Sequence, residues 1–234
     1  VVGDAGLASS FLEQALRGYR AFTEKVVAAT LEADAHWSRV QAGAGLLRLC
    51  ALPRLLHLFR ALPPEATEGF AADADAATLD AYERILTAKL TTLPQQTQAA
   101  LPTRLGGSGM LRFRDLRAQA WLSSWLATLP AVRGLAGPGV ATKEVIVAGD
   151  AGWAVSLRRA EEELAAEGVH LDQAGEVVPE EPAAAWGWED GTPALDQRQR
   201  HFSRRRAEAA RKRLLDSLPQ GPAARLRACG GPDA

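Results

Sequence analysis

Cysteine is nearly absent from this chain of 234 residues, which contains only Cys50 and Cys229. The two are far apart in sequence, and neither has a histidine or a second cysteine nearby at the spacing of a metal site. A disulfide framework and a zinc site are therefore not indicated, and we expect no metal and no cofactor. A reducing, intracellular compartment is the default expectation, and whether it is organellar (mitochondrial) or nuclear stays open.

Aromatic residues make up only 6% of the chain and β-branched residues are few, whereas alanine and leucine carry most of its hydrophobic content. This composition favours helices over strands, so we predict a mainly α fold, an irregular helical bundle. No stretch approaches the roughly 20 apolar residues that a membrane span requires, and no signal segment opens the chain. We therefore expect no membrane span. The only methionine is Met110, so Val1 is not expected to be a translation start.

An adjacent Asp-Asp pair is also missing, although polymerases of the reverse-transcriptase type need carboxylates that converge on divalent metal ions. Four acids that lie close together in sequence are expected to be solvated charges of a loop and a helix start, where they complement the helix dipole. These acids are Asp73, Asp75, Asp80 and Glu83. Ser108 lies between glycines without the strand context of a nucleophile elbow. We predict no catalytic residue, and hence no enzyme, although the chain could be a fragment of an RNA-directed DNA polymerase.

Apolar residues recur at helical spacing along much of the chain. One such stretch contains Pro53 in its middle, and we predict that two helical halves meet there. Another is expected to stop at Pro94, and a Gly-rich turn comes after it at 101–110. The predicted helices are 9–31, 37–62, 78–92, 115–129, 153–166 and 194–218.

Between Glu161 and Asp190 the chain is rich in acids and has no lysine or arginine. Such a segment is typical of a solvated linker. We therefore predict a helical domain over 1–160, an acidic linker over 161–193, and a basic C-terminal helix with its tail over 194–234.

Arginine is gathered in local clusters, although the net charge of the chain is −1. The turn Gly106-Gly107-Ser108-Gly109 lacks the Gly-Lys-Ser/Thr of a phosphate loop, so we prefer tight backbone packing as its explanation. Arginines near this turn could bind phosphate at a helix start, or could meet an acidic protein partner. The arginine-rich end of the chain could equally be a solvated helix. The candidate nucleic-acid-binding residues are Arg48, Arg54, Arg60, Arg104, Arg112, Arg114, Arg117, Arg204, Arg205, Arg206 and Arg211.

Two stretches carry a resemblance. The first runs from Leu46 to Arg60 and closes in Leu62-Pro63-Pro64, and the second is Leu101-Pro102-Thr103-Arg104-Leu105-Gly106-Gly107-Ser108-Gly109-Met110. Together they resemble the region after the catalytic palm in non-LTR retrotransposon reverse-transcriptase-like proteins, where a Leu-Pro-x-x-x-Gly-Gly-Leu-Gly-Leu motif leads into an Ala-rich helix. The chain departs from that motif at Ser108 and Met110, and in its acidic insertion 161–190.

The resemblance implies a thumb-like helical region that grips the template–primer backbone in an intact enzyme, whose catalytic half would lie upstream of Val1. We expect a retrotransposon-derived, non-catalytic structural subunit of a larger ribonucleoprotein assembly, with RNA or protein subunits as partners. The alternative is the nucleic-acid-binding C-terminal part of an active reverse transcriptase. A net charge of −1 together with the acidic segment 161–190 is poor for a free RNA binder, which favours the structural subunit.

Overall fold

The computed structural model describes residues 5–32, 36–136, 152–167, 169 and 198–229. These residues form helices and contain no strand, so the predicted mainly α fold, a packed helical bundle, is confirmed for them. They fall into two compact units. Of the described residues, the first unit contains 5–32, 36–58, 67–115 and 210–229, and the second contains 59–66, 116–136, 152–167, 169 and 198–209.

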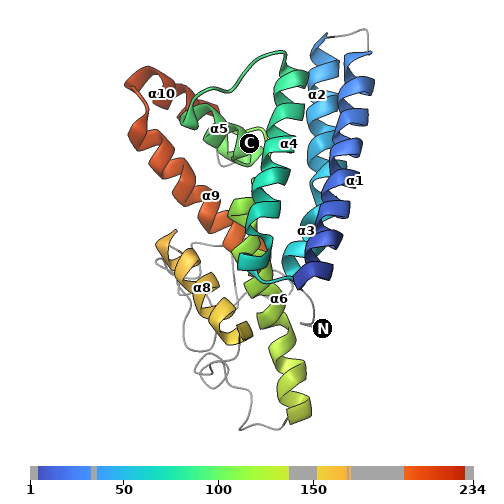
Figure 1. Cartoon of the computed structure of the whole chain (residues 1–234). Helices are drawn as coiled ribbons and strands as arrows, with labels where there is room; N and C mark the ends of the chain where they lie inside the picture. Colours follow the sequence, from blue (N-terminus) through green and yellow to red (C-terminus); the bar gives the residue numbers. More distant parts are fainter. Residues whose placement is uncertain (1–4, 33–35, 137–151, 168, 170–197, 230–234) are drawn as a thin grey trace. The chain divides into compact units, whose positions relative to one another are not determined.

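In the first unit, helix α1 (Ala5–Leu31) lies beside α2 (His36–Leu46) and α4 (Glu68–Leu86), as Figure 1 shows. The Tyr19 hydroxyl shares a hydrogen bond of 2.7 Å with Thr78 Oγ1 of α4, and burial raises the pKa of Tyr19 to about 12. The predicted helix 9–31 is confirmed. Its buried side chains are Leu12, Leu16, Tyr19, Thr23, Val26, Val27 and Thr30.

Helix α2 approaches its neighbours closely at Gly43. A Cβ atom there would lie 2.6 Å from Thr30 Cγ2 and 3.0 Å from Ile85 Cγ2. We expect Gly43→Ala to lower the free energy of unfolding by about 1–3 kcal/mol, because the helices must move apart. Chemical denaturation measures this value. Gly45→Ala is the matched control, since its Cβ would meet nothing within 4 Å, and it should raise stability by about 0.5–1 kcal/mol. Equal effects of the two changes would contradict the close approach.

The chain stays helical on both sides of Pro53. Helix α2 passes into a π-helix over Leu47–Ala51, and α3 (Pro53–Ala61) comes next. In this π-turn the Leu52 N–H donates to the Leu47 carbonyl, five residues back, at 3.0 Å. Proline has no N–H, and its ring clashes with the carbonyl of the preceding turn of a regular α-helix. The prediction of two helical halves is therefore confirmed, with a widened turn at the junction.

The helical run Arg39–Ala61 is long and apolar enough to cross a membrane by length and composition, contrary to the expectation from sequence. Of the 18-residue stretch of this run that meets the two criteria, 39% is buried inside the chain. Helix α2 packs against α1 and α4. A core helix of a bundle meets the same two criteria. Length and composition are therefore weak evidence of a membrane span here.

The prediction for α4 is wrong at both ends, because the helix spans Glu68–Leu86 and not 78–92. The expected acidic loop is helical, since the alanine-rich sequence 71–77 outweighs the lower helix propensity of its two aspartates. Two of the acids are also not solvated. Asp75 is 7% exposed and Glu83 is 9% exposed, and Glu83 accepts hydrogen bonds from Lys89 Nζ at 2.6 Å and the Leu90 N–H at 2.8 Å.

Helix α5 (Leu93–Ala100) lies where the sequence pattern predicts that Pro94 stops a helix. Pro94 instead stands in the first turn of a new helix, where its missing N–H costs no hydrogen bond. The Thr92 hydroxyl accepts from the Gln95 N–H at 3.4 Å, and the Thr92 N–H donates to Gln95 Oε1 at 3.0 Å. This reciprocal pair is a capping box. A Thr-x-x-Gln sequence with proline in the first turn is the signal that could have predicted α5.

The second unit draws on α6 (Phe113–Ala136), α8 (Gly152–Ala166) and α9 (Arg198–Ser217). The predicted helices 115–129 and 153–166 are confirmed, and residues 161–166 of the predicted acidic linker belong to α8. The rest of that linker from 170 on, and residues 194–197, lie outside the described residues. The predicted division into domains at 160 and 193 stays a prediction. The core residues are Ala118, Trp121, Leu122, Leu126, Leu157, Ala160, Leu164, Val169 and Phe202.

Candidate functional site

Asp75 of α4 holds the beginning of α6. Its Oδ1 accepts the Phe113 N–H at 2.5 Å, and its Oδ2 accepts the Arg114 N–H at 3.3 Å and Arg114 Nε at 3.2 Å. The first N–H groups of a helix have no partner within that helix. Asp75 therefore acts as a cap supplied by another helix. Burial raises the pKa of Asp75 above its usual 3.8, although the hydrogen bonds from Phe113 and Arg114 act in the opposite direction.

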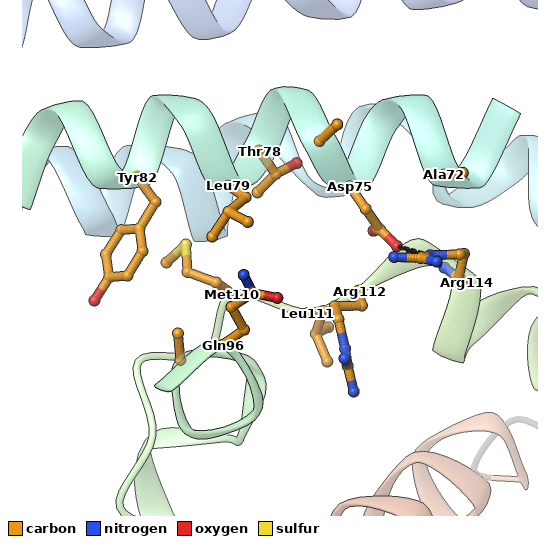
Figure 2. A pocket seen from close by; sticks show the side chains of 12 residues that line it. Ala72, Asp75, Thr78, Leu79, Tyr82, Gln96, Met110, Leu111, Arg112 and Arg114 are labelled. Carbon is orange, nitrogen blue, oxygen red and sulfur yellow. Dashed lines mark hydrogen bonds and ion pairs between the residues drawn. The ribbon is translucent and has the colours of Figure 1, made fainter. Parts of the chain in front are cut away.

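A pocket of about 190 Å³ opens beside this cap, in the first unit. Figure 2 shows Tyr82 at one end of it and Arg112 with Arg114 toward the other. Apolar side chains, among them Leu79 and Met110, line the wall between these ends. Each arginine is held through its Nε, Arg112 by Asp115 at 2.8 Å and Arg114 by Asp75 at 3.2 Å. The pocket thus joins an apolar wall to two anchored cations.

The structure brings together only part of the predicted cluster around the Gly-rich turn. Arg112 and Arg114 share the pocket, whereas Arg104 lies on the short 3-10 helix Thr103–Leu105. Arg117 belongs to the second unit, where it donates to the Pro64 carbonyl at 2.9 Å and pairs with Glu163 at 3.2 Å. Only 16% of the Arg117 side chain is exposed. Arg117 therefore has a structural partner of its own.

The Gly-rich turn is a packing device, in agreement with the interpretation preferred from its sequence. A Cβ atom at Gly107 would lie 2.0 Å from the Leu101 carbonyl oxygen. The same carbonyl accepts the Gly109 N–H at 2.8 Å, and Gly109 has a φ of +73°. The Tyr82 hydroxyl donates to Ser108 Oγ at 2.6 Å, which gives this serine a structural role.

The candidate arginines of the run 39–61 make separate contacts. The Arg48 side chain covers Gly109, since a Cβ there would lie 2.7 Å from Arg48 Cδ. The Arg54 guanidinium lies 4.4 Å from the centre of the Phe22 ring, a cation–π contact. Arg60 is exposed, and so is His57. Arg54 and Arg60 thus present their positive charge at the surface.

The candidate arginines of α9 differ in their burial and in their partners. Arg206 is buried and pairs with Glu167 at 3.1 Å, with 11% of its side chain exposed. Arg204 pairs with Glu208 one turn along the helix at 2.9 Å, and Arg205 and Arg211 are half-buried. The predicted alternative of a wholly solvated helix therefore fails at Arg206. Whether any of the eleven candidate arginines binds nucleic acid stays a prediction.

Among the described residues, no group of three or more His, Cys, Asp or Glu side chains is arranged to hold a metal ion. Comparisons of the chain with family models, with curated proteins and with solved structures found no match. The resemblance to reverse-transcriptase-like proteins therefore stays a prediction from its two sequence stretches. The function of the chain has to be inferred from its fold and its side-chain contacts.

Proposed function

We propose that this chain is a non-catalytic helical subunit of a larger, RNA-containing assembly, derived from a reverse-transcriptase-like protein. The main support is that two of the predicted RNA-binding arginines form ion pairs within the protein. Arg117 and Arg206 are largely buried in ion pairs with Glu163 and Glu167. Contact with phosphate would require these largely buried ion pairs to break, which has a free-energy cost.

The non-catalytic part of the proposal rests on the carboxylates. The sequence has no adjacent Asp-Asp pair, and the buried Asp75 already accepts three hydrogen bonds from Phe113 and Arg114. A carboxylate that caps a helix in this way has little capacity left for a metal ion. Its role in holding α6 supports a structural assignment.

The second candidate, a nucleic-acid-binding part of an active reverse transcriptase, is favoured by one feature. Residues 36–64 contain no aspartate or glutamate, and Arg54 and Arg60 are exposed there. A basic, acid-free helix is a suitable phosphate contact. This candidate requires a catalytic half elsewhere in the protein.

Fluorescence anisotropy with a structured RNA at several salt concentrations separates the two candidates. For a structural subunit we expect weak affinity, with a slope of log Kd against log salt corresponding to about one or two phosphate contacts. Neither Arg54→Gln with Arg60→Gln nor Arg112→Gln with Arg114→Gln should change the slope. Arg17→Gln with Arg20→Gln is the matched control, because both arginines are exposed and outside the candidate set.

Tight binding whose slope falls by roughly one unit for each arginine lost at 54 and 60 or at 112 and 114, but not at 17 and 20, would overturn the structural assignment. Stoichiometric co-purification of the intact protein with a ribonucleoprotein would support it.

A further inference from the structure

Four exposed apolar or weakly polar residues lie on the outer face of the run 39–61. Leu49 is 67% exposed and Leu46 is 41% exposed, and Cys50 and Pro53 are exposed as well. We call Leu46, Leu49, Cys50 and Pro53 the outer stripe. Their spacing of three and four residues places them along one side of a helix. Single exposed leucines are ordinary, whereas apolar side chains gathered on one face form a candidate interaction surface.

The π-turn contributes to this exposure. Leu47 and Ala51 are buried at the two ends of the π-helix, whereas Leu49 and Cys50 between them are exposed. A π-turn accommodates one residue more than an α-turn and is often found at functional sites. The widened turn therefore presents two neighbouring side chains outward while the core contacts on either side persist.

The charge around the outer stripe selects the kind of partner. No acid occurs from residue 36 to residue 64, while Arg48 and Arg54 stand next to the stripe in sequence and Arg54 is exposed. A partner that fits must offer apolar side chains to the leucines and a carboxylate to the exposed Arg54. An amphipathic helix with an acidic flank has both features, and helices commonly dock in this manner.

We propose that the outer stripe is the docking surface for an acidic amphipathic helix of a protein partner. This inference rests on the proposed function, since it names the surface by which the subunit would join its assembly. RNA alone would use the arginines and leave the leucines exposed to water. A membrane surface would use both, so it forms a separate arm of the test.

The probe is a synthetic peptide of about 20 residues with leucines at i, i+4 and i+7 flanked by glutamates, and its control carries lysines in place of the glutamates. Binding of the full chain is measured by titration. We expect Leu49→Asp to weaken binding of the acidic peptide by about tenfold or more, as for a central anchor residue. Leu93→Asp is the matched control, because Leu93 is 68% exposed but lies on α5, and it should have no effect.

Alkylation gives a second readout that needs no variant. Cys50 belongs to the outer stripe and Cys229 lies on α10 (Gln220–Cys229), and both thiols are free and exposed. The bound acidic peptide should slow the reaction of Cys50 with iodoacetamide and leave that of Cys229 unchanged. Equal protection of the two, or protection of neither, would count against the outer stripe.

Three outcomes overturn the docking proposal: no binding of the acidic peptide, equal binding of the lysine peptide, or acidic-peptide binding that Leu49→Asp leaves unchanged. Binding of phosphatidylcholine–phosphatidylglycerol vesicles that depends on Leu49, without peptide binding, would assign the stripe to a membrane instead. Tight RNA binding whose salt slope falls with the candidate arginine variants, and which Leu49→Asp does not alter, would refute the proposed function alone. The two failures are therefore distinguishable.

Discussion

Asp75→Ala is expected to lower the free energy of unfolding by about 2–4 kcal/mol, because the variant loses a helix cap and hydrogen bonds to a charged group together. The carboxylate of Asp75 accepts the N–H groups of Phe113 and Arg114 and one nitrogen of the Arg114 guanidinium. Alanine leaves these donors without a partner where α6 begins. Urea denaturation followed by circular dichroism measures the loss.

Asp73→Ala is the matched control on the same helix. The Asp73 side chain is 61% exposed and lies 3.9 Å from Arg20, and such surface pairs contribute about 0–1 kcal/mol. A loss at Asp73 equal to that at Asp75 would show that charge on α4, and not the cap, is what matters.

Asp75→Asn keeps an acceptor oxygen and should lose less than Asp75→Ala. It also gives a pH signature. Because burial raises the pKa of Asp75 in the folded protein above 3.8, folding favours the protonated carboxyl. The stability of the wild type relative to Asp75→Asn should therefore be greatest below pH 3.8 and decline as the pH rises through the raised pKa. A difference that increases with pH would contradict this direction.

Gly107→Ala should destabilise the protein by about 3 kcal/mol or more, since the added methyl group would overlap backbone atoms, which cannot rotate away as a side chain can. Its Cβ would lie 2.0 Å from the Leu101 carbonyl oxygen and 2.5 Å from the Gln98 carbonyl oxygen. The Gly69→Ala control adds the same methyl group in the first turn of α4, where nothing lies within 4 Å.

Gly69→Ala should leave stability unchanged or raise it by up to about 1 kcal/mol. Both variants are compared by thermal unfolding at one pH. If Gly107→Ala melted like the wild type, the backbone of the Gly-rich turn would not be as closely packed as the structure has it.

Local signals account for the parts of the fold that could be predicted from sequence. The spacing of apolar residues in 9–31 predicts the correct helix, because one face of α1 is buried along its length. The same reasoning fails for α4, where the acids in 73–83 indicate a solvated loop that does not form. Two of them are buried by contacts with backbone N–H groups and other side chains. Charge alone therefore does not define a loop.

The candidate site is harder to predict because its contacts join distant residues. Asp75 meets Phe113 and Arg114, and no rule of local spacing links residues so far apart. Arg117 and Arg206 resemble phosphate ligands in sequence because their carboxylate partners, Glu163 and Glu167, are distant along the chain. By contrast, the packing role of the Gly-rich turn is predictable, since glycine at consecutive positions indicates close backbone approach.

The π-turn at Leu47–Ala51 has an evolutionary consequence. A hydrogen-bonded ring that closes over five residues holds one residue more than an α-helical ring does, while the helix continues on both sides. Deletion of a single residue here would convert the π-turn into an α-turn and leave the inward side chains before and after it in register with α1 and α4. A relative with one residue fewer at 47–51 would therefore lack one of the two neighbouring outward side chains, at 49 or 50, and would keep the core contacts on either side.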